Sequence, residues 1–600
     1  MRRPAPSWLA GLVLALFLIA SLPLNAGQAA PAPSSFAARQ ILVKWVAEPP
    51  AWAGDVASRM GARREPLLPR LGTELWHVPA GQEQALAREL SGLPGVAYAA
   101  PNVLVHAAGV VRPPAAHGLL IGSGAAGALA LADLAPLVPD DPYYPQQWDM
   151  DLIRAPEAWA LSTGSAQASI AVIDSGVNYN LPDFAGRVVL GPDLADGDED
   201  PMDEDGHGTL VAGLATAAGN DGYGIAGVSW QSTLLVVRVL DRTGNGTCSD
   251  AAQGVAWAAD HNARVINLSL TANEPCPALA DAVAYAQGRG SLVVASAGNR
   301  GVGGAPAGSL ATLPGVIAVA ASTRQDSVAA YSSRGDFVDL AAPGDEVTGV
   351  GAQGELESGR GTSFAAPHVA GLAALLLARF PSLDAAGVET VLRATAVDLG
   401  APGWDELSGW GRIDAAAALS SLAFADVLPG SWYYPAVMTL AQAGAAAGYP
   451  DGSFRPEAAL TRAEWVALLG EAAGLSPLPA GEGPFGDVPA GHWAASWVQA
   501  AYAAGWVSGY PDGSFRPDAP VTRAEATAVL DKAWGLAPAA VEALSFNDEA
   551  GSWAAGWVEA ARAAGLVSGY PDGSFRPDAS ITRAEAAALA AKSLSLRTQP

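Results

Sequence analysis

The last third of this 600-residue chain consists of three copies of one unit. The stretch Gly-Tyr-Pro-Asp-Gly-Ser-Phe-Arg-Pro occurs at 448–456, 509–517 and 569–577, with spacings of 61 and 60 residues. Each copy follows a Phe-x-Asp and a tryptophan, and each precedes Thr-Arg-Ala-Glu. Repeated units of this kind bury a shared core by packing on one another. The sequence therefore predicts three similar modules, over 424–480, 481–541 and 542–600.

The rest of the chain is too long for a single core, so further domains are expected. Residues 1–30 carry Arg2 and Arg3, then an apolar run from Leu9 to Leu24, then small residues. This order is typical of a secretory signal peptide. A membrane-anchoring helix is the alternative, but the run is short for a span. No later segment is apolar over a spanning length, so we expect a secreted chain with no membrane span after signal cleavage.

Residues 139–423 alternate apolar strand-like runs with helix-like segments. The runs lie at 170–173, 234–239, 265–268, 292–295 and 316–320, each bounded by turn residues. Continuous apolar runs of this length are typical of parallel strands that are buried on both faces. The fold class of this domain is therefore α/β.

Two shorter regions precede it. Residues 31–106 contain strand-like runs at 40–46 and 96–102 and a helix-like segment at 82–90, which indicates a small α+β unit. Residues 107–138 are rich in alanine, glycine and proline and show no periodic pattern, so they are predicted to be a linker.

The formal net charge of −26 is unevenly distributed. Residues 139–423 carry 13 basic and 34 acidic side chains, a balance of −21, whereas residues 36–105 carry 7 basic and 6 acidic ones. Nucleic-acid binding requires a basic patch, which this sequence lacks, so we expect no nucleic-acid partner. The acidic clusters indicate bound cations or a solubilising surface.

Three polar residues stand where an α/β protein places its chemistry. Asp174 ends the apolar run at 170–173, at the carboxyl end of a strand. His207 lies between two glycines, so its neighbours do not pack it into a core. Ser363 opens an apolar helix, where free backbone N–H groups stabilise a developing oxyanion. Taken singly, the serine also fits a helix cap and the aspartate a turn.

In the order Asp174, His207, Ser363, these motifs resemble those of the subtilisin-like serine proteases, the subtilase family, over about 141–414. The resemblance implies a doubly wound, mostly parallel sheet with helices on both faces. It also implies a serine endopeptidase that acts on polypeptides without an organic cofactor. Ser363 would be the nucleophile, His207 the base and Asp174 its orienting acid, with Asn299 completing the oxyanion hole.

The same resemblance suggests which residues contact the substrate. Those expected to line the primary specificity pocket are Ser269, Leu270, Thr271, Gly298 and Gly304. Thr271 stands where most relatives have glycine, and its β-branched side chain would narrow or reshape the cleft.

The chain has two cysteines, Cys248 and Cys276. In an exported protein they are compatible with one disulfide, and two free buried thiols are the alternative. The family resemblance places them on loops beside the upstream substrate subsites, where a disulfide would brace the rim of the cleft.

Two acidic groups are candidate sites for a structural calcium ion, the one cofactor we expect. The first is a crowded loop just before His207, which either binds a hard cation or lies open to water. Its expected ligands are Asp193, Asp196, Asp198 and Asp200. The second is implied by the resemblance and consists of Asp141, Asp183 and Asp221.

Residues 31–106 resemble the inhibitory prosegment of the same family, which makes the chain's own prosegment an expected partner. Its slight positive balance suits docking on a strongly acidic domain. Cleavage is expected between about Val105 and Pro142.

The C-terminal repeats resemble S-layer homology (SLH) modules, which form a pseudo-threefold α-helical unit that binds anionic cell-wall polysaccharide. Arginines and tryptophans at equivalent positions would contact the sugar, or would instead hold the modules together. They are Trp432, Arg462, Trp493, Arg523, Trp553 and Arg583. The expected protein is a secreted, wall-bound endopeptidase made as a zymogen. The alternative is a surface structural or adhesion protein whose protease domain is restricted or inactive.

Overall fold

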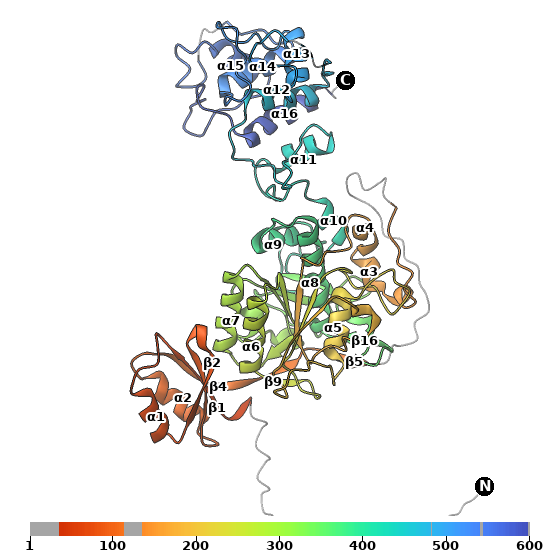
Figure 1. Cartoon of the computed structure of the whole chain (residues 1–600), viewed down its shortest axis with the longest axis vertical. Helices are drawn as coiled ribbons and strands as arrows, with labels where there is room; N and C mark the ends of the chain where they lie inside the picture. Colours follow the sequence, from red (N-terminus) through yellow and green to blue (C-terminus); the bar gives the residue numbers. More distant parts are fainter. Residues whose placement is uncertain (1–34, 113–134, 480, 482, 541–543, 598–600) are drawn as a thin grey trace, which may run out of the picture.

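The computed structural model describes residues 35–112, 135–479, 481, 483–540 and 544–597. The predicted signal peptide lies outside these residues. Figure 1 shows three bodies in a row: a small N-terminal unit, a large central domain and a helical C-terminal unit at the opposite end.

The N-terminal unit is a four-stranded antiparallel sheet, in the order β4-β1-β3-β2, with two helices. Trp45, Trp76 and Leu90 are buried between the sheet and these helices. The predicted small α+β unit is thus present. Its elements are β1 (Phe36–Trp45), α1 (Ala53–Arg59), β2 (Arg63–Leu68), β3 (Thr73–His77), α2 (Glu83–Ser91) and β4 (Val96–Ala107).

The central domain contains a seven-stranded sheet in the order β14-β13-β12-β10-β6-β8-β7, and all neighbours are parallel. The five predicted apolar runs are all strands of this sheet. The strands are β6 (Ile170–Asp174), β7 (Val188–Asp193), β8 (Leu234–Arg238), β10 (Val265–Leu268), β12 (Leu292–Ser296), β13 (Val316–Ser322) and β14 (Leu340–Pro343).

Helices cover both faces of this sheet, which explains why its strands are apolar throughout. In β6, Ile170 and Val172 share a core with α5 (His207–Thr216) and α8 (Thr362–Arg379). Ala171 and Ile173 point to the other face, toward α6 (Cys248–Asp260) and α7 (Pro277–Gly288). The α8 side also holds α3 (Trp148–Leu152), α4 (Ala155–Trp159), α9 (Ala385–Ala394) and α10 (Ala415–Ser420).

Ala107 and residues 110–112 of the predicted linker belong to strands, with Ala108 and Gly109 between them. β4 runs from the N-terminal unit into the central domain, where it pairs with β9 (Asn245–Thr247) and β11 (Leu270–Ala272). β5 (Val110–Arg112) then joins β15 (Asp345–Val350) and β16 (Leu356–Arg360) in a small sheet. Such strands are held by backbone hydrogen bonds, so their side chains show no periodic signal. Residues 113–134 lie outside the described part of the chain.

The C-terminal modules close into a ring. The N–H of Val521 donates to the carbonyl oxygen of Leu460, that of Leu460 to Ile581, and that of Ile581 to Val521. This cycle gives the pseudo-threefold arrangement expected of the repeats. The helices around it are α11 (Tyr434–Gln442), α12 (Arg462–Ala473), α13 (Ala495–Ala503), α14 (Arg523–Ala533), α15 (Ala555–Ala563) and α16 (Arg583–Arg597).

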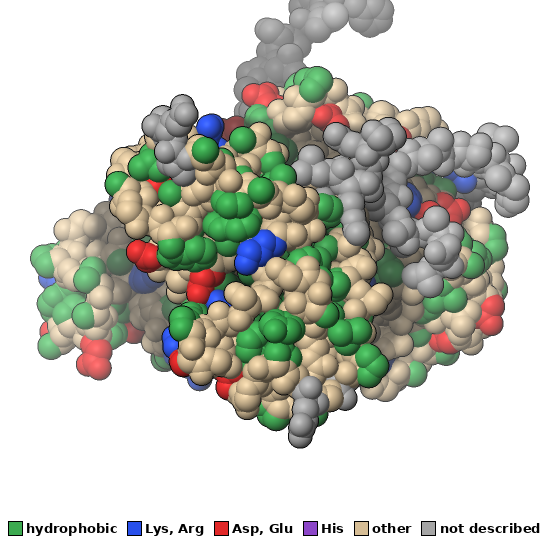
Figure 2. Space-filling model, turned by 90° about the horizontal axis from the view of Figure 1, so that it is seen from above, with side chains coloured by type: hydrophobic (Ala, Val, Ile, Leu, Met, Phe, Trp, Pro, Cys, Tyr) green, Lys and Arg blue, Asp and Glu red, His purple; other side chains and the backbone are tan. Residues whose placement is uncertain are grey.

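On the face seen in Figure 2, lysine and arginine side chains are scattered among acidic and apolar ones, without a broad basic patch on the residues drawn in colour. Among the described helices, only α8 is long and apolar enough to cross a membrane, and 89% of its 18-residue window is buried inside the molecule.

Candidate active site

His207 and Asp174 form a buried pair at the carboxyl edge of the main sheet. His207 begins α5 and Asp174 ends β6, and the imidazole Nδ1 lies 2.7 Å from a carboxylate oxygen of Asp174. Burial alone would lower the pKa of His207, but the adjacent Asp174 carboxylate outweighs this effect and raises it. Nε2 is buried and has no hydrogen-bond partner. This nitrogen is therefore available to accept a proton from a nucleophile.

Asp203 fixes the loop that carries His207, a role that sequence reasoning missed. One carboxylate oxygen accepts hydrogen bonds from the Ser175 hydroxyl and the Gly206 N–H, both at 2.9 Å. The other accepts from the Thr209 N–H at 2.8 Å and its hydroxyl at 2.6 Å. In the sequence Asp203 is one of many acids in a crowded loop, and only its hydrogen bonds to the residues around His207 separate it from the others.

Ser363 lies in the first turn of α8, fully buried. Its hydroxyl donates to the carbonyl oxygen of Ser269 at 2.9 Å, and the Ser269 hydroxyl donates to the Ser363 carbonyl oxygen at 2.7 Å. The nucleophile is thus held against the strand region that leads into β11.

The Asn299 amide is oriented toward the same place. Its Oδ1 accepts hydrogen bonds from the N–H of Thr362 at 3.0 Å and the Thr362 hydroxyl at 3.1 Å. These bonds fix the amide so that Nδ2 points into the cleft beside the N–H of Ser363. Together the two donors form an oxyanion hole.

The chain's own backbone occupies this hole. The carbonyl oxygen of Ala108 accepts from Asn299 Nδ2 at 2.6 Å and from the Ser363 N–H at 3.2 Å. The Ala108 N–H donates to the Ser269 carbonyl oxygen at 3.1 Å. Upstream, β4 lies between β9 and β11 as a middle strand, with Val105 opposite both Gly246 and Ala272. The peptide bond that follows this carbonyl joins Ala108 to Gly109.

Glycine is required at 361 for this approach. Gly361 has a φ of +149°, and a Cβ there would lie 2.6 Å from the Ala108 carbonyl oxygen.

Of the five predicted substrate-binding residues, Ser269, Leu270 and Thr271 lie along the bound strand. Leu270 lies opposite Ala107 and Thr271 opposite His106, directly after Ser269. Gly298 and Gly304 both contact Ser333, whose N–H donates to the Gly298 carbonyl oxygen and whose hydroxyl donates to that of Gly304. A Cβ on Gly298 would lie 3.1 Å from the Ser333 hydroxyl, so added bulk there would crowd the wall.

Cys248 and Cys276 form a disulfide. Cys248 directly follows β9, and Cys276 lies four residues beyond β11. The bond thus joins the chain just after the two strands that hold the peptide.

The acidic group Asp141, Asp183 and Asp221 suits a hard cation. Asp183 is 1% exposed, and neither of its carboxylate oxygens has a hydrogen-bond partner. Burial, followed by the charges of Asp221 and Asp141, raises the pKa of Asp183 to about 8. In the described part of the chain the carboxylates alone do not make a complete metal site, so loop carbonyl oxygens would have to complete the shell.

The loop of Asp193, Asp196, Asp198 and Asp200 differs from the calcium site that the sequence predicts, because its negative charge is met by arginine. Arg238 lies 2.7 Å from Asp193 and 2.9 Å from Asp196. Asp200 accepts from the Tyr179 hydroxyl at 2.7 Å, and Asp198 accepts from the Asp200 N–H at 2.9 Å. The Arg238 guanidinium thus lies among these carboxylates, where the sequence predicts a calcium ion.

The predicted sugar-binding arginines make contacts between modules instead of facing solvent. Each donates through Nε to a phenylalanine carbonyl oxygen of the next module and pairs with a glutamate, and their side chains are 10–11% exposed. The pairs are Arg462–Glu525 and Arg523–Glu585 at 2.9 Å and Arg583–Glu464 at 3.2 Å. These contacts favour the alternative that the arginines join the modules. Trp432, Trp493 and Trp553 are 63%, 61% and 63% exposed.

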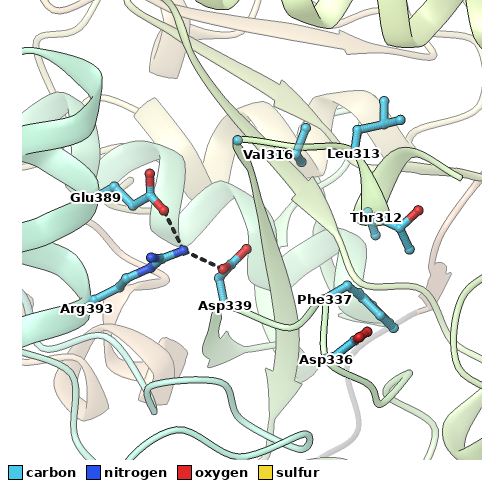
Figure 3. Close-up of a pocket in the computed structure, with 10 residues that line it drawn as sticks. Thr312, Leu313, Val316, Asp336, Phe337, Asp339, Glu389 and Arg393 are labelled. Carbon is cyan, nitrogen blue, oxygen red and sulfur yellow. Dashed lines mark hydrogen bonds and ion pairs between the residues drawn. The ribbon is translucent and has the colours of Figure 1, made fainter. Parts of the chain in front are cut away.

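A small polar cavity of about 180 Å³ has no catalytic residue in its lining. In Figure 3, the Arg393 guanidinium lies between Glu389, at 2.5 Å, and Asp339, at 2.7 Å. Three of the charged side chains in this lining, Arg393, Glu389 and Asp339, are thus paired with one another.

Comparison with known proteins gives the same three-part division. Residues 165–411 match the subtilase family, residues 24–102 match the fervidolysin N-terminal prodomain, and three segments match the S-layer homology domain. These segments are 423–464, 484–527 and 545–587.

Individual relatives match mainly the central domain. Thermitase from Thermoactinomyces vulgaris is 41% identical over 274 residues, which are 46% of this chain and 94% of thermitase. The thermophilic serine proteinase of Bacillus sp. (strain AK1) is 39% identical over 318 residues, 53% of this chain and 72% of that protein. The structure of fervidolysin from Fervidobacterium pennivorans, a keratinolytic enzyme related to subtilisin, matches with a TM-score of 0.56 at 26% identity. That match covers 66% of this chain and 62% of fervidolysin. The chain therefore belongs to the subtilase family and is a subtilisin-like serine endopeptidase that carries its own prodomain and three SLH domains.

Proposed function

We propose that this endopeptidase is made as a secreted zymogen, frees itself by cutting between Ala108 and Gly109, and then acts while bound to the cell wall. The observation that supports this proposal best is the Ala108 carbonyl oxygen in the oxyanion hole, 2.6 Å from Asn299 Nδ2. This contact supports one particular peptide bond within the range of 105–142 that the sequence suggests.

The chemistry follows from the positions of the side chains. The Ser363 hydroxyl turns from the Ser269 carbonyl toward His207 Nε2 and attacks the Ala108 carbonyl carbon as the imidazole takes its proton. Asn299 and the Ser363 N–H stabilise the oxyanion, and Asp174 stabilises the imidazolium through Nδ1. The imidazolium then protonates the leaving amine of Gly109. Water then attacks the acyl-enzyme carbonyl as His207 takes its proton, and His207 returns that proton to the Ser363 oxygen as the ester bond breaks.

Contacts outside the cleft support an inhibitory role for the N-terminal unit. Lys44 pairs with Asp281 on α7 at 2.6 Å, and Tyr98 donates to the same carboxylate group at 2.9 Å. Arg70 pairs with Asp260 on α6 at 2.6 Å. These are basic groups on the prosegment facing acidic ones on the catalytic domain, so the cut prosegment would stay docked until it is degraded or displaced.

The decisive experiment compares the full chain with its Ser363→Ala variant. We expect only the unmutated chain to release a mature form whose N-terminus is Gly109 and to cleave denatured casein. Prosegment release by both proteins, or by neither, would instead favour a structural or adhesion protein that retains the protease fold.

Attachment to anionic cell-wall polysaccharide is proposed through the exposed Trp432, Trp493 and Trp553. Co-sedimentation of the Ser363→Ala chain with purified cell walls tests this role, with the three tryptophans replaced by alanine as the comparison. Equal sedimentation of both proteins would remove the tryptophans from the wall site.

A structural calcium ion is proposed at Asp183, held with Asp141 and Asp221. A bound cation would offset the repulsion among these buried carboxylates, so chelation is expected to lower the melting temperature. The Asp183→Asn variant should lose most of this sensitivity. Equal melting of the unmutated protein with calcium and with excess chelator would contradict the site.

A further inference from the structure

The residue just after the scissile bond lies against an aromatic ring. A Cβ built on Gly109 would lie 2.5 Å from Cε2 of Phe364, 3.1 Å from Cζ and 3.3 Å from Cδ2. Carbon atoms that are not bonded pack at about 3.5–4.0 Å. Any side chain larger than hydrogen would therefore have to displace the ring.

The ring has little room to move. Phe364 directly follows the nucleophile, is fully buried and belongs to the core that fills the α8 side of the sheet. On another side it rests against the backbone of β16, where a Cβ on Gly359 would lie 2.6 Å from Cγ. It also packs against the His207 imidazole, with ring centroids 5.2 Å apart. A shift of the ring would compress this core or disturb the catalytic base.

Beyond Gly109 the cleft is permissive. Val110, Val111 and Arg112 pair with Arg360, Gly359 and Ser358 through the backbone of β16, an interaction that any side chain allows. Val110 and Arg112 are exposed and Val111 is half-buried. Val111 packs against the α8-side core, whereas the tightest contact on the leaving side is at Gly109, the position that Phe364 covers.

We propose that Phe364 is a specificity-determining residue that makes this protease prefer glycine immediately after the cleaved bond. The inference deepens the proposed function and rests on it. Its ligand class is a polypeptide with glycine on the leaving side and a small residue such as alanine on the acyl side.

The test uses the mature enzyme and peptides copied from its own junction, Leu-Val-His-Ala-Ala-X-Val-Val-Arg, with X as glycine or alanine. We expect kcat/KM for X = Gly to exceed that for X = Ala by roughly tenfold to a hundredfold, the range typical of one misfitting carbon. The Phe364→Ala variant should reduce this ratio to about threefold or less. A general loss of activity in this variant would lower kcat/KM for both peptides equally and would not change their ratio.

Phe364→Met is a second variant in case alanine leaves a cavity that unfolds the domain, and it should also reduce the ratio. Thr271→Gly, on the acyl side of the bond, is the matched control and should leave the ratio unchanged. In the full chain, Gly109→Ala should delay prosegment release, and adding Phe364→Ala should restore it.

Equal cleavage of both peptides by the unmutated enzyme would overturn the inference while leaving the proposed protease intact. An unchanged ratio in both Phe364 variants would assign the preference to another residue. Failure to cleave any peptide would overturn the proposed function and this inference with it.

Discussion

The catalytic cleft and the SLH ring both contain the most distinctive sequence motifs of the chain. They differ in whether the polar atoms of those motifs have hydrogen-bond partners. In the cleft, His207 Nε2 and one oxygen of Asp174 are buried with no hydrogen-bond partner. In the ring, each arginine of the repeated Thr-Arg-Ala-Glu bonds to a carbonyl oxygen and a glutamate of the next module.

The difference holds for the motif residues of the two regions, since elsewhere in the ring Asp531 and Glu549 are also buried without a hydrogen-bond partner. A buried polar group without a partner destabilises the folded state, so it persists where function needs it. A fully partnered group stabilises the contact it makes. Substitutions that remove a hydrogen-bond partner, either in the ring or in the cleft, test this difference.

The largest expected effect is in the cleft. Asp174→Asn keeps the shape of the side chain but favours the wrong tautomer of His207. We expect kcat to fall by about 10⁴, as in other serine proteases. Peptide hydrolysis measures this loss. Co-sedimentation with cell walls should be unchanged, and a parallel loss of wall binding would show that cleft and ring are not independent.

Removal of one oxyanion donor should have the next largest effect. Asn299→Ala and Asn299→Asp both lack the amide N–H and should lower kcat by about 10² to 10³, the loss known for the equivalent donor in subtilisin. KM should change little. Near-normal kcat in both variants would mean that the Ala108 carbonyl oxygen does not mark the oxyanion position.

In the ring, Arg583→Ala should destabilise the C-terminal unit by about 2–3 kcal/mol, because it removes the cation paired with Glu464 and the donor to the Phe454 carbonyl oxygen. Urea unfolding of the Ser363→Ala chain measures this loss. Arg576→Ala is the matched control, since its pair with Asp572 is about half exposed and should contribute little to stability. Equal losses would remove the distinction between joining and surface arginines.

The smallest effect concerns an exception inside the ring. Glu549 is fully buried with no hydrogen-bond partner, at the position that Val427 and Val488 hold in the other modules. Burial, together with nearby Glu559, raises the pKa of Glu549 to about 7. The folded state therefore holds a proton that the unfolded chain releases near pH 4, and stability falls as pH rises from about 4 to about 7.

Glu549→Val should accordingly stabilise the C-terminal unit by about 1–3 kcal/mol at pH 8 and by less at pH 5. Thermal unfolding at the two pH values measures the difference. A variant less stable than the unmutated chain at pH 8 would show that Glu549 has a partner or ligand, and would place it with the functional groups of the cleft.

Much of this arrangement was predictable from sequence, because buried parallel strands and repeats leave periodic patterns. The five apolar runs of the central sheet and the three modules are examples. The residue Ala108 was not predictable, because a strand held in a cleft by its backbone has no side-chain pattern, and residues 107–112 therefore resembled a linker. The sequence also could not show that Asp183 and Asp193 differ. Only the fold brings Arg238 to the Asp193 carboxylate and leaves the Asp183 carboxylate without a hydrogen-bond partner.

The hydrogen-bonded cycle through Leu460, Val521 and Ile581 also sets an order of assembly. The chain emerges from its N-terminus, and Ile581 follows Leu460 by 121 residues. During synthesis, the central hydrogen bonds of the first module can form only after the third module has been made. By then, every strand of the catalytic sheet has already left the ribosome. The protease can thus fold before the SLH ring closes, and if the ring binds the cell wall as proposed, a chain cut short within the last module would yield an enzyme that is free to diffuse.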